Sequence, residues 1–248
     1  MSTLKGKSAF VTGGTRGMGQ ATVKRLAAEG AAVAFTYVHS EERAQQIVKD
    51  IQQAGGNALA IKADGSVKGA VQAAIIAAAN TFGKIDILIN NAAASVSGPL
   101  ETAADRSMDY DRMIDINIRS VAEAVRTAQQ FMPDGGRIVN IASVGGSRIG
   151  GPQFSDYAAT KAAVSAYTRG LAWDLAARNI TVNSVEPGAT DTDMMPKEPA
   201  IREAYINAIP LKRLGKPEEI AAMVNFLVGD EAGYITGSAF TVDGGISA

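Results

Sequence analysis

The residues best suited to chemistry in this sequence are a tyrosine and a lysine four positions apart. Tyr157 and Lys161 fall in a stretch of helical periodicity, so both side chains are expected on one face of a helix. A phenol, with a pKa of about 10, is a poor acid or base at neutral pH, and a neighbouring ammonium lowers that pKa by stabilising the phenolate. Ser143 follows a short apolar run, and its hydroxyl can orient a carbonyl oxygen. Together these side chains predict proton transfer at a carbonyl or alcohol oxygen.

A glycine-rich motif separates the first apolar run from the first helical stretch. Residues 12–19 read TGGTRGMG, with glycines at 13, 17 and 19. Glycines there allow a tight turn and the close approach of a phosphate, while unpaired N–H groups and the helix dipole favour an anion. The spacing differs from the commoner Gly-x-Gly-x-x-Gly, so the argument depends on the position between strand and helix. The motif predicts a binding site for the pyrophosphate of a dinucleotide.

The end of the second apolar run indicates which dinucleotide is bound. An Asp or Glu about 20 residues past the glycine turn would hold the ribose hydroxyls of NAD, but residues 35–40 read FTYVHS. Arg16 in the turn, with His39 and Ser40, supplies hydrogen-bond donors for an adenosine 2′-phosphate. We therefore expect NADP as the cofactor. NAD stays open as the alternative because Glu41 and Glu42 follow closely.

The pattern of apolar residues indicates the elements that position these groups. Short apolar runs alternate with longer amphipathic stretches, which is typical of strands and crossover helices in a parallel sheet. Strands are expected at residues 8–12, 31–37, 58–62, 85–90, 137–142, 181–186 and 239–242. Helices are expected at residues 17–29, 41–54, 67–81, 105–132, 155–178 and 217–227. The pattern predicts an α/β fold with one doubly wound, seven-stranded parallel sheet and helices on both faces. The glycine turn and Ser143 would then lie at the carboxyl ends of strands, where such sheets bind ligands.

The composition fits a single catalytic domain spanning residues 1–248. Hydrophobic residues make up 46% of the 248 residues, and the formal net charge is -1. That is enough apolar material for a sizeable core, and it gives no field that would attract nucleic acid or an anionic membrane. The chain has no cysteine and one histidine, so disulfides, thiolate chemistry and histidine-rich metal sites are excluded, and no metal is expected.

Two further features concern location and the substrate side. The chain begins without the apolar core of a secretory signal, and its longest small-apolar run, residues 73–79, is far shorter than the roughly 20 residues of a membrane span. A cytoplasmic protein is expected. Residues 188–214 are interrupted by Pro196, Pro199 and Pro210 and are predicted to form a mobile flap over the substrate.

The chain resembles the short-chain dehydrogenase/reductase family over essentially its whole length. The matching features are the glycine motif at 12–19, Asp64, residues 90–92 (NNA), Asn117, Ser143, Tyr157, Lys161, residues 187–188 (PG) and residues 242–245 (VDGG). The resemblance implies a Rossmann fold and an NAD(P)-dependent oxidoreductase. By this resemblance Tyr157 is the general acid, Ser143 holds the carbonyl oxygen, Lys161 lowers the tyrosine pKa and bonds the nicotinamide ribose, and Asn117 positions a water that relays protons.

The resemblance also implies the cofactor contacts. Asp64 would contact adenine, Asn90 would line the cleft, and residues 187–192 would pass beside the nicotinamide with Thr190 or Thr192 at its carboxamide. With the residues named above, the expected contacts are Gly13, Thr15, Arg16, Gly17, Met18, Gly19, Tyr37, His39, Ser40, Asp64, Gly65, Asn91, Ala92, Ala93, Tyr157, Lys161, Pro187, Gly188, Thr190 and Thr192. Ala93 departs from the family, which more often has glycine there, so the local backbone geometry is open.

Within the family the chain is similar to the 3-oxoacyl-acyl-carrier-protein reductases. Residues 131–136 (FMPDGG) carry no positive charge, whereas a basic patch would help to recognise an acidic carrier protein. We therefore expect a carbonyl reductase of that group acting on a ketone or β-ketoester. The substrate is expected between Ser143, Tyr157, the loop at 145–154 and the flap, near Met194, Met195 and Tyr205.

Two other functions stay open. The chain could be an NAD-dependent alcohol or sugar dehydrogenase that works in the oxidative direction. It also resembles regulatory members of the family that bind a cyclic dinucleotide, through residues 35–37 (FTY) and 133–138 (PDGGRI). The intact Ser143, Tyr157 and Lys161 favour catalysis, because a pure binding protein needs none of them. The resemblance further implies a homotetramer.

Overall fold

The sheet follows the expected strands closely. The structure is a computed structural model that describes residues 4–148 and 151–248. Its strands are β1 (Ser8–Val11), β2 (Ala32–Tyr37), β3 (Ala58–Lys62), β4 (Ile87–Asn90), β5 (Arg137–Ile141), β6 (Thr181–Pro187) and β7 (Ala239–Val242). All pairs are parallel, in the order β3-β2-β1-β4-β5-β6-β7. The prediction of one doubly wound, seven-stranded sheet is confirmed.

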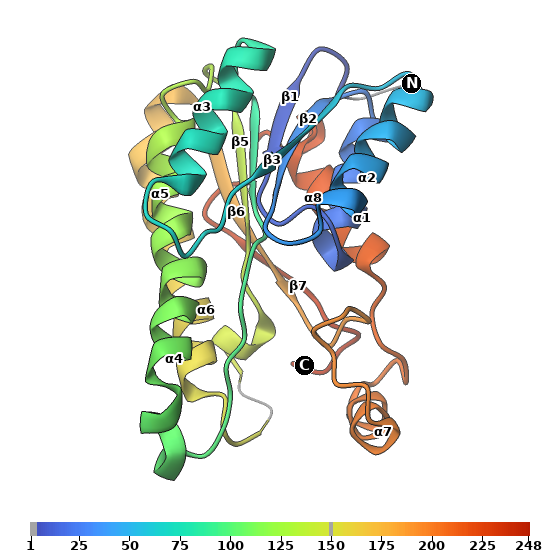
Figure 1. Cartoon of the computed structure of the whole chain (residues 1–248), viewed down its shortest axis with the longest axis vertical. Helices are drawn as coiled ribbons and strands as arrows, with labels where there is room; N and C mark the ends of the chain where they lie inside the picture. The colour runs from blue at the N-terminus through green and yellow to red at the C-terminus, as the bar shows by residue number, and fades with distance from the viewer. Residues whose placement is uncertain (1–3, 149–150) are drawn as a thin grey trace.

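Helices cover both faces of the sheet (Figure 1). One face packs against α1 (Gly17–Ala28), α2 (Glu41–Gln53) and α8 (Pro217–Val228), and the other against α3 (Ala70–Phe82), α5 (Ser120–Ala128) and α6 (Ser155–Leu175). Alternate strand residues serve the two cores, so Val11 of β1 packs on the α1 side and Phe10 on the α3 side. Because both faces are buried, the strands appear in the sequence as continuous apolar runs.

The helix expected at residues 105–132 is wrong as a single element. The structure instead has a 3-10 segment η1 (Leu100–Arg106), helix α4 (Ser107–Ile114), a π-helical turn η2 (Asp115–Arg119) and then α5. The Ser120 N–H bonds the carbonyl of Asp115, five residues back, and the Ser120 hydroxyl donates to the carbonyl of Ile116 at 2.6 Å. A single π turn spans too few residues for periodicity to distinguish it from an α-helical turn, so the sequence did not predict it.

The segment at residues 188–214 has more structure than expected. It contains helix α7 (Pro199–Ala208), in which Pro199 occupies the first turn, where a missing N–H costs nothing. Around it, Met195, Ile209 and Leu214 are buried in a small cluster that also contacts Ile246 near the end of the chain. In Figure 1 α4 and α7 extend beyond the sheet on opposite sides, and the C-terminus lies between them.

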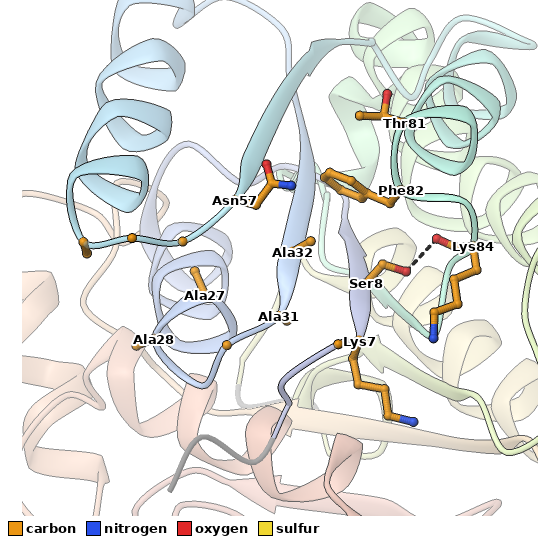
Figure 2. Close-up of a pocket in the computed structure, with 15 residues that line it drawn as sticks. Lys7, Ser8, Ala27, Ala28, Ala31, Ala32, Asn57, Thr81, Phe82 and Lys84 are labelled. Carbon is orange, nitrogen blue, oxygen red and sulfur yellow. Dashed lines mark hydrogen bonds between the residues drawn. The ribbon is translucent and has the colours of Figure 1, made fainter.

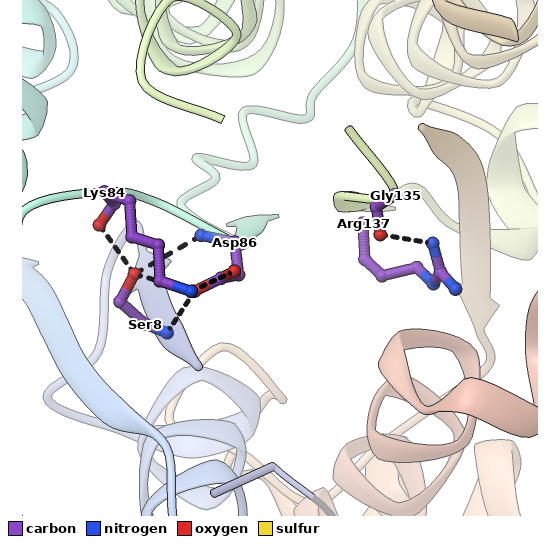
Figure 3. A network of polar contacts seen from close by, with 5 residues as sticks. All are labelled: Ser8, Lys84, Asp86, Gly135 and Arg137. Carbon is purple, nitrogen blue, oxygen red and sulfur yellow. Dashed lines mark hydrogen bonds and ion pairs between the residues drawn. The ribbon is translucent and has the colours of Figure 1, made fainter. Parts of the chain in front are cut away.

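The amino edge of the sheet carries a depression of about 620 Å³ (Figure 2). It is lined by the ends of α1, α2 and α3 and by the starts of the strands that follow them. A buried network beside it joins β1 to β4 (Figure 3). Asp86 accepts the Ser8 N–H at 2.7 Å and pairs with the Lys84 ammonium at 2.8 Å. These contacts hold the starts of β1 and β4 together. The expected catalytic residues lie at the opposite, carboxyl edge of the sheet.

Three short 3-10 segments complete the fold: η3 (Val144–Gly146), η4 (Ala176–Arg178) and η5 (Asp230–Ala232). The strand order reverses between β1 and β4: β2 and β3 follow on one side of β1, and β5, β6 and β7 follow on the far side of β4. Such a switch point opens a crevice at the carboxyl ends of the strands. Within the described residues no helix is long and apolar enough to cross a membrane.

Candidate active site

The glycine turn lies at the switch point and is hydrogen-bonded to β2 on one side and to the residues after β4 on the other. Gly13 has a φ of +70°, and its N–H donates to the Thr36 hydroxyl of β2 at 2.9 Å. On the other side, the Thr12 hydroxyl accepts the N–H groups of Asn91 and Ala92 at 2.9 and 3.0 Å. The Asn91 amide donates back to the carbonyls of Thr12 and Gly13. The turn therefore has one fixed shape before any ligand arrives.

Helix α1 begins inside this turn. Arg16 precedes it in extended conformation with its side chain exposed, and no side chain caps the helix. The N–H groups of the first turn have no carbonyl within the helix to bond, so they can receive an anion. A Cβ at Gly19 would overlap the carbonyl oxygen of Gly13, and one at Gly14 would lie 2.6 Å from Phe35. Gly19 therefore permits the turn itself, while Gly14 serves packing.

The residues expected around an adenosine phosphate follow β2. Tyr37 is buried, His39 is exposed, and Ser40 precedes α2 without capping it. Because β1 and β2 are neighbours, this loop lies beside the glycine turn that carries Arg16. Arg43, in the first turn of α2, forms a 4.0 Å ion pair with Asp193 in the 188–214 segment. The sequence did not suggest Arg43, because a contact between distant segments leaves no local pattern.

Asp64 is held in place by partners of its own. One carboxylate oxygen accepts the N–H and hydroxyl of Ser66 at 2.9 and 2.8 Å, and the other pairs with Arg112 of α4 at 2.9 Å. Burial alone raises the pKa of Asp64, but the hydrogen bonds from Ser66 and Arg112 outweigh it and the net pKa is lowered. The adjacent Gly65 lies close to Ser120 of α5. The expected adenine contact of Asp64 stays a prediction.

Ser143 and Tyr157 are brought together by η3. The Ser143 hydroxyl accepts the Gly145 N–H at 3.1 Å, and it lies close enough to the Tyr157 hydroxyl to favour a lower pKa for that group. A Cβ at Gly146 would lie 2.8 Å from the backbone nitrogen of Ala162, so η3 lies directly on α6. This close packing places the serine over the first turn of α6, where Tyr157 is located. Two hydroxyls therefore converge on one point, as expected for holding a carbonyl oxygen.

Lys161 is buried one helical turn beyond Tyr157. Its ammonium donates to the carbonyl of Ile141 at 2.9 Å and lies 5.9 Å from the centre of the tyrosine ring. Burial lowers the pKa of Lys161 to about 8. Burial raises the pKa of Tyr157, and the nearby Ser143 hydroxyl opposes that rise only in part. The net pKa of Tyr157 is therefore raised while the ammonium bonds the Ile141 carbonyl, and the expected lowering of that pKa by Lys161 stays a prediction.

Asn117 lies in the π turn and is almost fully buried. Its side-chain oxygen accepts the Ala94 N–H at 2.8 Å, and its amide donates to the Ala94 carbonyl and to the Thr160 hydroxyl, both at 2.9 Å. The side chain therefore clamps the loop after β4 to α6. The expected role of Asn117 in positioning a water stays a prediction. The sequence did not suggest Ala94 or Thr160 as its partners.

The remaining expected residues lie at the same edge of the sheet. Asn90 donates to Asn140 at 2.8 Å within the sheet. Ala93 is not among the described residues with positive φ, so alanine replaces the family's usual glycine without strain. After β6, the Thr190 hydroxyl donates to the carbonyl of Gly188 at 3.0 Å, and Thr192 lies against Gly17 of the glycine turn.

The substrate loop and possible metal ligands complete the description of the site. Residues 149–150 of the expected substrate loop lie outside the described residues. Elsewhere, across 4–148 and 151–248, no three or more His, Asp or Glu side chains are grouped so that they could hold a metal ion. The chemistry that this edge can offer is therefore that of hydroxyls, an ammonium and a phosphate-binding turn.

Comparison with known proteins agrees with this geometry. The family model described as "Enoyl-(Acyl carrier protein) reductase" matches residues 13–247. The chain belongs to the short-chain dehydrogenase/reductase family. It is 40% identical over 249 residues to the "Cyclic-di-GMP-binding biofilm dispersal mediator protein" of Escherichia coli (strain K12), covering 100% of both chains. It is 38% identical over 249 residues to a "3-oxoacyl-[acyl-carrier-protein] reductase" of Synechocystis, covering 99% of both.

A solved structure of similar shape is the blue fluorescent protein from a metagenomic library in complex with NADPH. Its TM-score is 0.96 at 44% identity, and the match covers 99% of this chain and 100% of that one. The expectations of family and Rossmann fold are confirmed. The chain is an oxidoreductase of this family.

The glycine turn generates a first prediction. Gly19→Ala should lower the free energy of unfolding by about 1–3 kcal/mol, because the added methyl overlaps the Gly13 carbonyl and comes 2.5 Å from the Asn91 amide. Gly229→Ala is the matched control, since its nearest neighbour would be 3.4 Å away. Thermal unfolding at one protein concentration compares the two. Equal unfolding midpoints for both variants would contradict the close approach at Gly19.

Lys161 generates a second prediction. Its folded pKa of about 8 lies below the ordinary value of 10.5, so the unfolded state binds more protons in that interval. The free energy of unfolding should therefore rise with pH, by about 1.5 kcal/mol between pH 8 and 9.5. Denaturant unfolding of the wild type, measured relative to Lys161→Met at each pH, isolates this contribution. A difference that stays flat or falls across this range would show that the lysine keeps an ordinary pKa.

Proposed function

We propose that the chain is an NADPH-dependent carbonyl reductase acting on a ketone or β-ketoester. The observation that carries the proposal is the convergence of the Ser143 and Tyr157 side chains, with the buried Lys161 one helical turn beyond Tyr157. This group lies at the sheet edge that also bears the glycine turn. Phenol, serine hydroxyl and ammonium are the groups that protonate an oxygen, and a dinucleotide at the turn would complete a reduction.

The residues of the chain supply placement and the proton. When bound, the reduced nicotinamide supplies a hydride for the carbonyl carbon. Tyr157 carries its proton at neutral pH, as an ordinary phenol does, and transfers it to the carbonyl oxygen as negative charge develops there. Ser143 donates a hydrogen bond to the same oxygen. Lys161 stabilises the tyrosinate that remains until solvent returns a proton, and the product is the alcohol.

The proposed cofactor fits the turn and the loop beside it. The uncapped start of α1 and the glycine turn would hold the pyrophosphate. The exposed Arg16, with His39 and Ser40, would hold the 2′-phosphate of NADP, since residues 37–40 contain no carboxylate to select NAD. The similar structure solved with NADPH supports this preference. An NAD-linked dehydrogenase working in the oxidative direction is the alternative in the same class.

The proposed substrate is apolar and of medium size. On one side of the catalytic group, Leu100 and Met108 are 74% and 82% exposed on η1 and α4. On the other side, Met194 and Ile201 are exposed on the 188–214 segment, which we propose acts as the substrate flap. Exposed apolar side chains on both sides favour an apolar ligand. The family description names an enoyl substrate and one relative a 3-oxoacyl carrier protein, so both thioester classes belong in the test.

A second candidate function is the binding of a cyclic dinucleotide. It is favoured by the 40% identical relative from Escherichia coli, whose name states that activity. The intact Ser143, Tyr157 and Lys161 weigh against it, since binding alone requires none of them. Both functions use the same fold, so a variant without the catalytic acid separates them.

We also propose a homotetramer. Helix α6 carries Ala159, Ala162, Ala166, Gly170 and Trp173 exposed along its length, and Trp173 is 86% exposed. An exposed apolar face of this kind is typical of a surface covered by another subunit. The expected cytoplasmic location stays a prediction.

Tyr157→Phe tests the reaction. Purified protein should consume NADPH with aryl ketones, β-ketoesters or carrier-free β-ketoacyl thioesters, and not with enoyl thioesters. The variant should lose at least about 100-fold in kcat, because the proton donor is gone, while its affinity for NADPH stays within about threefold. Turnover by the variant at the wild-type rate would overturn the assignment. A cellular phenotype that survives in the variant would support the cyclic-dinucleotide function.

Arg16→Ala tests the cofactor preference. The affinity for NADPH should fall about 10- to 100-fold through loss of a charged hydrogen bond to the 2′-phosphate, and the affinity for NADH should stay unchanged. Arg25→Ala, in the last turn of the same helix, is the control and should affect neither. Fluorescence titration of each reduced cofactor gives the dissociation constants. An equal loss for both cofactors would remove Arg16 from the 2′-phosphate.

A further inference from the structure

The last six residues of the chain lie across the substrate side of the site. Asp243 follows β7 and packs against Gly188, where an added Cβ would come 2.6 Å from that of Asp243. Gly188 directly follows β6, at the point where the chain enters the 188–214 segment. In Figure 1 the C-terminus lies between α7 and the strand ends. The tail, residues 243–248, therefore starts beside residues 187–192, the stretch expected to pass beside the nicotinamide.

The tail is packed closely on the base of the flap. A Cβ at Gly244 would lie 2.7 Å from Ile209, and one at Gly245 would lie 3.0 Å from Pro210. The Leu211 N–H donates to the carbonyl of Gly244 at 3.2 Å. Ile246 contacts the small buried cluster around α7. The tail and the flap base thus share one core, so a shift of either displaces the other.

The tail also has a fixed internal shape. The Asp243 carboxylate accepts the N–H groups of Gly245 and Ser247 at 2.8 and 2.9 Å, and it accepts the Ser247 hydroxyl as well. The positive φ values of Gly244 and Gly245, +66° and +91°, allow this tight turn. The tail is therefore a folded element and can transmit position from one end to the other.

The last residue of the tail is hydrogen-bonded to the loop that begins at Ser143. The Arg148 guanidinium donates to the carbonyl of Ala248 at 3.0 Å. The Arg148 N–H donates to the carbonyl of Val144 at 2.7 Å, so the arginine belongs to the turn that begins at Ser143. One side chain therefore links the loop that holds the carbonyl-orienting serine to a tail packed on the flap.

We propose that residues 243–248 form a strap between the flap and the loop at residues 143–148. The hydrogen bond from Arg148 to Ala248 holds these two segments at a fixed separation, and this separation limits the size of the carbonyl substrate. This inference rests on the proposed carbonyl reduction and names Arg148 as a specificity-determining residue. Arg148 acts through the strap and takes no part in the proton transfer. The bond is exposed and single, so its loss loosens the strap without removing buried packing.

The test compares Arg148→Ala with Arg148→Lys and Arg25→Ala. Lysine can still donate to the Ala248 carbonyl, and Arg25 lies on α1, away from the strap. For each protein, kcat/KM is measured with NADPH for a small β-ketoester and for a bulky diaryl ketone. The dissociation constant of NADPH and hydrogen exchange of residues 188–214 and 243–248 are measured alongside.

In Arg148→Ala the ratio of bulky to small substrate should rise at least about fivefold, mainly through KM, with NADPH affinity unchanged. Exchange should increase in both the strap and the flap, and both control variants should behave like the wild type. A ratio within twofold of the wild type, or a parallel loss of NADPH affinity, would overturn the proposal. If the wild type reduces no carbonyl, the proposed function fails by itself, and unchanged exchange in the flap would then separately reject the strap.

Discussion

The rest of the site depends on the junction between β1 and β4, where the two halves of the sheet diverge. Thr12 and Asn91 cross this junction with four hydrogen bonds, and Thr36 of β2 binds the turn from the other side. In a parallel sheet the connections on either side of this point cross to opposite faces, so a crevice forms there independently of the side chains that line it. The side-chain bonds convert the crevice into a rigid turn aimed along α1, and a rigid turn loses little entropy on binding a phosphate. The catalytic residues can then be placed relative to a cofactor whose position is already determined.

Burial controls the second half of the site. Tyr157 and Lys161 are both withdrawn from water, and burial disfavours the charged form of each, so it raises the pKa of the tyrosine and lowers that of the lysine. The tyrosine is consequently protonated at neutral pH, and the pKa of the lysine is about 8. A helix that buries both can do so because η3 lies on it so closely that only glycine fits at position 146. Packing thus sets the direction in which the pKa of each side chain shifts.

Much of the fold could be predicted from sequence, and the failures have identifiable causes. Strands such as Ile87–Asn90 are buried on both faces, so they appear as continuous apolar runs that periodicity detects. The π turn at Asp115–Arg119 was not predicted because five residues are too few for periodicity to distinguish a π turn from an α-helical one. Ser143, Tyr157 and Lys161 were found because a helix face and a strand end bring them together locally. Asn117 was named, but its bonds to Ala94 and Thr160 were not, since they join segments far apart in the chain.

The catalytic residues are positioned by local structure, whereas the segments around them are positioned by long-range contacts. Chemistry is placed by short-range rules: a strand end for Ser143, one helical turn between Tyr157 and Lys161, and a helix start at Gly17. The proposed walls around the substrate come instead from three distant segments, which are the loop after β5, residues 188–214 and the tail. Their mutual contacts include the Arg148 bond and the cluster around Met195. Changes in these walls leave the proton donor and the phosphate turn untouched. A chain built this way can keep one reaction while its substrate changes, which fits a fold whose relatives differ in what they are named for.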